Sequence, residues 1–113
     1  MSAITTHILD TSLGKPAAGV PVKLDLRVDG EWVRVGTGIT DDDGRIKDLL
    51  RSDFEFKEGQ YRIEFAVSEY FDKLKTESFY PYVKITFSVR DTGSHYHVPL
   101  LLNPYGYSTY RGS

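Results

Sequence analysis

Three histidines and no cysteine set the chemistry available to this sequence near neutral pH. His95 and His97 are two residues apart, which on a strand places both side chains on one face. Together with the distant His7 they resemble the three-ligand set of a catalytic zinc site with an open fourth position. The same imidazoles can transfer protons without a metal. The spacing leaves both kinds of hydrolytic site open, beside the simpler interpretation of three surface histidines.

The last residues are also unusual for a chain end. Residues 105–113 are rich in tyrosine and small residues and close on Tyr110-Arg111-Gly112-Ser113. In the functional interpretation this tetrapeptide folds into a site, where Gly112 permits a bend and Arg111 offers a planar fork of donors to carbonyl or carboxylate oxygens. In the structural interpretation it is an edge strand with a loose tip.

An aspartate run at residues 41–43, followed by Gly44, resembles the start of a calcium loop. Such a loop needs oxygen ligands at flanking positions where this sequence has Ile39 and Leu50. A calcium site is therefore excluded, and the run predicts a turn that leads into a short strand at 45–49.

The surrounding sequence alternates apolar and polar residues with a period of two, which predicts strands. The Asp29-Gly30 pair predicts the turn of a hairpin over residues 20–37. One segment, 68–75, instead fits two turns of helix. The remaining predicted strands cover residues 4–9, 60–67, 82–89, 95–102 and 105–110. Seven or eight short strands in one small chain indicate an all-β sandwich.

The alternation also predicts where the histidines lie. Ile4 and Ile8 share one face of the first strand and His7 occupies the other. On the later strand, Val98 belongs to the apolar face and His97 to the opposite one. All three histidines are therefore expected on an outward sheet surface.

Length and composition exclude several classes of protein. The chain has 113 residues, which predicts a single domain over 1–113. No apolar stretch approaches the ~20 residues of a membrane span, so no membrane role is expected. The net charge of −2, from 14 basic and 16 acidic residues that intermingle, gives no basic stripe for nucleic acid. The first residues, from Met1 to Thr6, do not resemble a secretory signal, so the cytoplasm is the expected location.

Taken together, these motifs resemble the 5-hydroxyisourate hydrolases, the transthyretin-related proteins of urate catabolism. The resemblance runs over nearly the whole chain and includes the terminal Tyr-Arg-Gly-Ser as the family signature. It rests on residues 6–10, 14–17, 40–45, 95–102, 104–105 and 110–113.

The resemblance implies a transthyretin-like sandwich of two four-stranded sheets with one short helix. It implies a homotetramer, a dimer of dimers, with active sites in clefts between subunits. The implied reaction opens the ring of 5-hydroxyisourate with water and needs no cofactor and no metal. Transthyretin shares the fold and binds thyroxine, but it lacks the histidines, the arginine and the terminal signature at the matching positions. A binding protein without turnover is therefore the less favoured alternative.

The resemblance also assigns roles to residues of this sequence. His7 and His97 are expected to activate water and transfer protons, and Arg45 to hold the substrate and stabilise the oxyanion. These three are the expected catalytic residues. The expected substrate-binding residues are His95, Tyr110, Arg111, Gly112 and Ser113.

Overall fold

The computed structural model describes residues 3–113 and places nine strands and one short helix among them. Each of the longer predicted strands, and the helix, is confirmed within a few residues. The elements, in chain order, are β1 (Ile4–Asp10), β2 (Lys15–Pro16), β3 (Pro21–Val28), β4 (Glu31–Ile39), β5 (Arg45–Ile46), β6 (Gly59–Phe65), α1 (Val67–Lys73), β7 (Val83–Val89), β8 (Tyr96–Asn103) and β9 (Gly106–Thr109).

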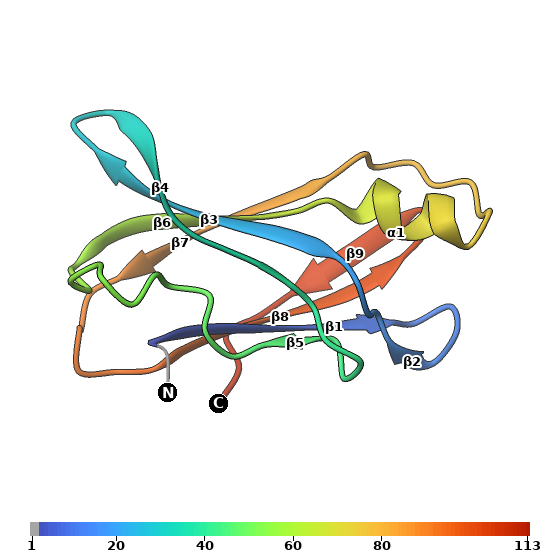
Figure 1. Ribbon diagram of the computed structural model, residues 1–113, viewed down its shortest axis with the longest axis horizontal. Helices are drawn as coiled ribbons and strands as arrows, with labels where there is room; N and C mark the ends of the chain where they lie inside the picture. Colours follow the sequence, from blue (N-terminus) through green and yellow to red (C-terminus); the bar gives the residue numbers. More distant parts are fainter. Residues whose placement is uncertain (1–2) are drawn as a thin grey trace.

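The strands form two packed sheets, and α1 lies at one end between the layers (Figure 1). One sheet has the order β4-β3-β6-β7, and the other has the order β2-β1-β8-β9 with β5 also paired to β1. The predicted sandwich is confirmed. The second sheet has five strands rather than four, because the two-residue strands β2 and β5 both attach to β1.

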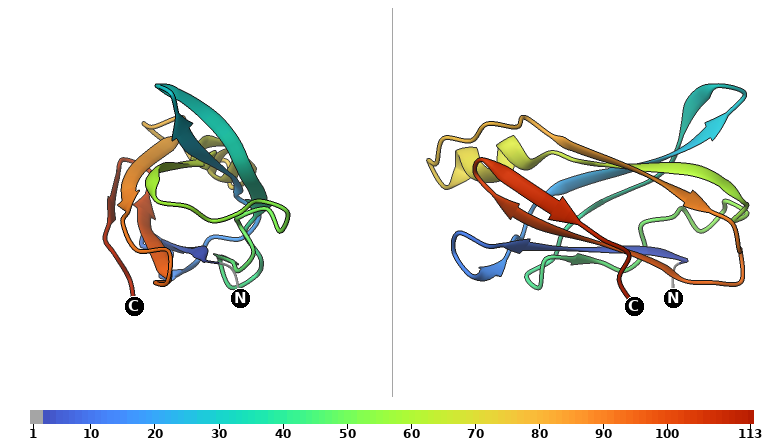
Figure 2. Two further views of the ribbon diagram at one scale, coloured as in Figure 1. Left: turned by 90° about the vertical axis from the view of Figure 1, so that its left-hand side faces the viewer. Right: turned by 180° about the vertical axis from the view of Figure 1, so that it is seen from behind.

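The pairing of β1 with β8 is parallel, whereas the other strand pairs among residues 3–113 are antiparallel. Its register sets Thr5 opposite His97 and His7 opposite Pro99. The beginning of the chain and its last long strand therefore lie side by side at the centre of one sheet. The start of β1 and the last residues of the chain lie on the same side of the sandwich (Figures 1 and 2).

The core lies between the two sheets and is built by the alternation seen in the sequence. Ile8 and Leu100 from one sheet and Tyr61, Ile63 and Phe65 from the other are fully buried. Each such side chain stabilises the fold by roughly 1.5–3 kcal/mol. The apolar faces of β1 and β8 point inward, so the histidine side of these strands is turned outward, as the sequence predicts.

The β3–β4 hairpin turns at Asp29 and Gly30, whose positive φ values of 51° and 81° are those of a type I′ turn. One feature of β3 departs from simple alternation. Asp25 lies on the charged face yet is only 2% exposed, because Arg34 and Arg62 cover it at 2.6 and 3.2 Å. The register shift between Leu24 and Asp25 allows this arrangement.

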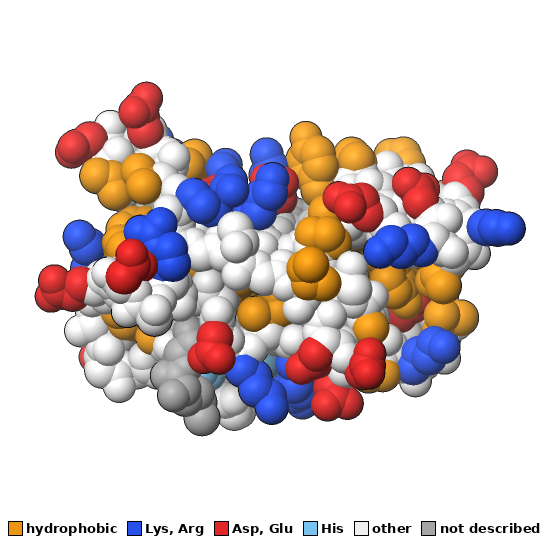
Figure 3. Space-filling view, viewed as in Figure 1, with side chains coloured by type: hydrophobic (Ala, Val, Ile, Leu, Met, Phe, Trp, Pro, Cys, Tyr) orange, Lys and Arg blue, Asp and Glu red, His pale blue; other side chains and the backbone are white. Residues whose placement is uncertain are grey.

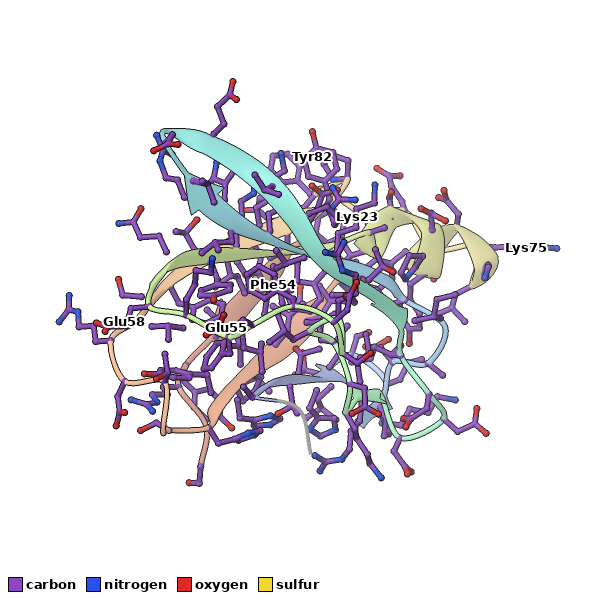
Figure 4. All side chains as sticks on the ribbon, turned by 60° about the vertical axis from the view of Figure 1, so that its left-hand side comes forward. Lys23, Phe54, Glu55, Glu58, Lys75 and Tyr82 are labelled. Carbon is purple, nitrogen blue, oxygen red and sulfur yellow. The ribbon has the colours of Figure 1, made fainter. Side chains whose placement is uncertain are left out.

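Helix α1 is held to the β1 end of the sandwich through Tyr70, whose hydroxyl donates to Asp10 Oδ2 at 2.7 Å. Asp10 also accepts hydrogen bonds from Ser12, so its buried charge is fully partnered. The helix ends before Lys75, which has a φ of 55° and projects beyond the helix (Figure 4). At the other end of the molecule, Glu55 and Glu58 mark the long connection between β5 and β6 (Figure 4). No helix among residues 3–113 is long and apolar enough to cross a membrane.

Candidate active site

His7 and Arg45 face each other across the β1–β5 pair. The aspartate run that precedes Arg45 forms the predicted turn. The carboxylate of Asp41 accepts hydrogen bonds from the amides of Asp43 and Arg45, both at 2.9 Å. Gly44 has a φ of 72°, and a Cβ there would lie 2.5 Å from the carbonyl oxygen of Ile8. The turn therefore requires glycine and fixes Arg45 beside His7.

The other two histidines meet at a single hydroxyl. Thr5 Oγ1 lies 3.0 Å from His95 Nε2 and 2.8 Å from His97 Nδ1. The parallel register of β1 and β8 produces this contact, because it sets Thr5 opposite His97. His97 is half-buried, His95 is exposed and Thr5 is buried.

The C-terminal segment runs back along β8 and closes over His97. The amide of Gly112 donates to the carbonyl oxygen of His97 at 2.8 Å, forming an isolated antiparallel bridge. A Cβ on Gly112 would lie 2.6 Å from His97 Cδ2, so a side chain there would collide with the imidazole. The close approach to His97, rather than a left-handed backbone, accounts for glycine at this position.

Within the chain, Arg111 makes two contacts with β8 and the residue before it. Its guanidinium lies over the ring of Tyr96, 4.5 Å from the centroid, and one of its nitrogens donates to the carbonyl oxygen of His95 at 3.4 Å. Both contacts hold the terminal segment against β8. Arg111 therefore helps to place Gly112 over His97.

The histidine face holds a hollow of about 750 Å³, and its lining comes from four separate parts of the chain. His7 lies beside it, opposite Arg45. In Figure 3, histidine atoms are visible beside basic side chains at the lower edge of the molecule. The hollow is lined by Thr5, Thr6, Arg45, Ile46, Lys47, Asp48, His95, His97 and Ser113.

A second hollow, of about 260 Å³, lies on the other side of His97 between β7 and the β8–β9 pair. Tyr110 and Arg111 line this second hollow and not the first. Of the eight predicted site residues, four line the first hollow: Arg45, His95, His97 and Ser113. Two others adjoin them, since His7 lies opposite Arg45 and Gly112 is hydrogen-bonded to His97. Only His97 among the predicted residues lines both hollows.

The electrostatics of the site favour the neutral forms of His7 and His97 near pH 7. Burial lowers the pKa of His97, and the nearby charges of Arg45, His7 and His95 lower it further. Burial and Arg45 also lower the pKa of His7, although a hydrogen bond with the Asp43 backbone acts in the opposite direction. A neutral imidazole can accept a proton, so both groups are in the form that a general base needs.

Several lining residues were missed by reasoning from the sequence alone. Thr5 is two residues before His7, so alternation places both side chains on the same face of the first strand. Lys47 is two residues after Arg45, and the same argument places these two side chains on one face. That signal was present in the sequence. The sequence holds no comparable signal for Asp48, because the position of Asp48 depends on the path that the chain takes after β5.

The zinc interpretation has no preformed ligand set. Across residues 3–113, no three histidine, cysteine, aspartate or glutamate side chains are grouped so that they could hold one metal ion. Two of the relevant nitrogens, His95 Nε2 and His97 Nδ1, are directed at the hydroxyl of Thr5 instead.

The arrangement can be compared with known proteins. A model of the HIUase/transthyretin family matches residues 4–112, which include the three histidines, Arg45 and Gly112. This chain belongs to the HIUase/transthyretin family. The resemblance inferred from the sequence motifs is confirmed.

Members of the HIUase/transthyretin family that resemble this chain include both 5-hydroxyisourate hydrolases and a transthyretin. A 5-hydroxyisourate hydrolase of Salmonella dublin is 47% identical, over 97% of this chain and 80% of its own length. The structure of Klebsiella pneumoniae 5-hydroxyisourate hydrolase is 36% identical with a TM-score of 0.81, over 97% of this chain and 98% of that one. Sea bream transthyretin in complex with thyroxine is 31% identical with a TM-score of 0.90, over 97% and 94%. The fold alone therefore does not separate the two activities.

Proposed function

We propose that this protein is a 5-hydroxyisourate hydrolase, and that the hollow beside His97 is its active site. The single observation that carries the choice of enzyme over carrier is the convergence of His7, His97 and Arg45 on one outward face. The sequence similarity to hydrolases of this name supports the same choice.

The reaction adds water to an amide-like carbonyl of the substrate ring. One imidazole of the His7–His97 pair takes a proton as the water oxygen bonds to the carbonyl carbon. The carbonyl oxygen then carries the negative charge, which the guanidinium of Arg45 stabilises. When the ring C–N bond breaks, the leaving nitrogen receives a proton from the imidazolium, and the product is 2-oxo-4-hydroxy-4-carboxy-5-ureidoimidazoline. A positioned base contributes on the order of 10²–10⁴-fold to such a rate.

Arg45 suits the role of electrostatic clamp because its side chain is exposed to the hollow and no ion pair is recorded for it among residues 3–113. Its planar fork of donors matches the carbonyl oxygens of a flat ring. Ser113 and His95 line the same hollow and are proposed to contact the substrate. Tyr110 and Arg111 are proposed to act at its boundary, next to His97.

We also propose a homotetramer that works in the cytoplasm, with each hollow completed at a subunit boundary. Several aromatic side chains are exposed beside the edges of both sheets, in the segment before β7 and on β9. Packing them against a second copy would remove apolar surface from water. Light scattering after size-exclusion chromatography would measure the subunit number. The exposed aromatics are Phe79, Tyr80, Tyr82, Tyr105 and Tyr107.

The deciding experiment follows the decay of freshly generated 5-hydroxyisourate by ultraviolet absorbance, with and without the protein. We expect decay well above the spontaneous rate, and loss of that acceleration in His97→Ala. Circular dichroism would verify that the variant is folded. A folded wild-type protein that does not accelerate the decay would favour a thyroxine-type carrier instead.

A parallel experiment addresses the metal-dependent alternative. Treatment with a chelator should leave the rate unchanged, since the proposed steps use only imidazole and guanidinium groups. If the chelator abolishes activity and zinc restores it, the three histidines act as metal ligands.

A further inference from the structure

The hydroxyl of Thr5 stands between two imidazole rings and has only one proton to share. It is within hydrogen-bond distance of His95 Nε2 at 3.0 Å and of His97 Nδ1 at 2.8 Å. Thr5 is itself only 9% exposed, and the β1–β8 register holds it in place. Water therefore has little access to the hydroxyl as a competing partner.

Two arrangements of protons satisfy both contacts and also use the proton of the Thr5 hydroxyl within the cluster. Each neutral imidazole has one N–H, and the hydroxyl donates one hydrogen bond while accepting others. In the first arrangement Thr5 donates to His97, and His95 donates to Thr5. In the second, Thr5 donates to His95 Nε2 and His97 Nδ1 donates to Thr5. The tautomers of the two histidines are therefore linked through Thr5.

The surroundings of His97 favour the second arrangement. Its free nitrogen, Nε2, belongs to the ring that lines a hollow shared with Arg45 and Lys47. Both of these side chains are cations that carry only donors, so they stabilise a bare lone pair and disfavour a further N–H. The charge of Arg45 also lowers the pKa of His97, which keeps the ring neutral.

We propose that Thr5 is a positioning residue that holds the proton of His97 on Nδ1 and leaves Nε2 free to accept a proton. His95 completes this series of hydrogen bonds, because its Nε2 accepts the hydrogen bond that the Thr5 hydroxyl donates. The tautomer assignment rests on the two contacts of the Thr5 hydroxyl and on the cations that line the hollow. The consequence for catalysis, that His97 rather than His7 is the base, rests on the proposed function.

The test uses nitrogen-15 NMR of the full-length protein labelled at histidine, because the Nδ1–H and Nε2–H tautomers have distinct nitrogen shifts. Three histidines give few signals, and His95→Gln and His97→Gln assign them. Wild type and Thr5→Ser should both show His97 protonated on Nδ1. Thr5→Val has nearly the same shape without the hydroxyl, and should show a mixture of tautomers at His97.

A second variant tests the same series of hydrogen bonds from the side of His95. His95→Ala removes the acceptor of the Thr5 proton, so the hydroxyl should turn and donate to His97 Nδ1. The protein should then show His97 protonated on Nε2. A His97 tautomer unchanged in both His95→Ala and Thr5→Val would overturn the proposal, as would Nε2–H at His97 in the wild type.

Activity provides a separate measurement. Thr5→Val should lower kcat/KM on the order of 10- to 100-fold, the range seen when partners that orient metal-bound histidines are removed. Thr5→Ser should retain most of it. Thr11→Val is a matched control. Thr11 follows β1 directly, and its hydroxyl also donates a hydrogen bond to β8, to the carbonyl oxygen of Leu102 at 3.2 Å rather than to a histidine. This variant should leave both the tautomers and the rate unchanged.

The NMR measurement and the kinetic measurement together distinguish a failure of this inference from a failure of the proposed function. The NMR result needs no substrate, so it stands even if 5-hydroxyisourate proves not to be the substrate. If the enzyme hydrolyses 5-hydroxyisourate and Thr5→Val is fully active, the role of Thr5 fails and the hydrolase remains.

Discussion

Gly112 lies so close to His97 that a methyl group on its α-carbon would come within 2.6 Å of the imidazole Cδ2. The same methyl group would meet Cγ of Pro99 at 3.1 Å. In Gly112→Ala, therefore, either the terminal segment or the ring must move. A displacement of about 1 Å in a catalytic group can cost ~10²-fold in rate, so we expect a loss of kcat/KM of that order. The melting temperature should change little, since the terminal segment contributes little to the core.

Gly106→Ala is the matched control for this substitution. Gly106 is also in the C-terminal part, but a Cβ there would meet nothing closer than 3.7 Å, which is ordinary contact. It should retain activity. Equal activity in Gly112→Ala and wild type would show that the bridge over His97 does not position the ring.

Arg45→Lys keeps the positive charge and removes the planar fork of donors. Loss of one donor to a developing oxyanion costs on the order of 10²–10³-fold in kcat, and we expect Arg45→Lys to fall near the lower value. Stability should be unchanged, because Arg45 is exposed. Steady-state kinetics with thermal melting would measure both effects.

Arg51→Lys provides the comparison for that substitution, since Arg51 pairs only with the exposed carboxylate of Asp53 at 2.8 Å. It should leave the rate intact. Full kcat/KM in Arg45→Lys would mean that charge alone, without fork geometry, serves the reaction.

The pH dependence of kcat/KM follows from the histidine pKa values. Burial, followed by the charge of Arg45, lowers the pKa of both His7 and His97 below 6.5. The neutral base therefore predominates at pH 7, and the rate should fall as the pH decreases through these lowered pKa values. Removing the guanidinium in Arg45→Gln should raise both pKa values, which an NMR titration of the imidazole protons would show. A rate that begins to fall well above pH 6.5 would be inconsistent with these pKa values.

Deletion of residues 110–113 should separate folding from activity. It removes the hydrogen bond from Gly112 to His97 and the contact of Arg111 with Tyr96, while every fully buried core side chain remains. We expect a folded protein by circular dichroism, with kcat/KM reduced by at least as much as in Gly112→Ala. If the truncated chain unfolds, the segment is part of the structural framework.

Much of this fold can be read from the sequence because alternation reports directly on which face is buried. The strand around Ile63 and the outward position of His97 follow from period two alone. Alternation does not report which strand lies next to which. The parallel pairing that sets Thr5 against His97 joins residues 92 apart, so the bridging hydroxyl could not be foreseen.

Two side chains show why residue type alone is a poor guide to role. Arg111 belongs to the family signature, yet its guanidinium is stacked on Tyr96 and bonded to a backbone oxygen. Asp25 occupies a polar position in the alternating pattern of β3, where a solvent-exposed side chain is expected, yet two arginines from neighbouring strands bury it. In both cases a tertiary partner, which local sequence does not specify, decides the outcome.

The side-by-side placement of β1 and β8 has a consequence for biosynthesis. Strand β1 leaves the ribosome before its parallel neighbour β8, which follows about 90 residues later. At typical elongation rates of roughly 5–20 residues per second, β1 waits for seconds without that partner. A nascent chain interrupted before residue 95 lacks two of the three histidines. Hydrolytic activity would thus appear only after synthesis has passed β8, so turnover would report that this strand has been made and paired with β1.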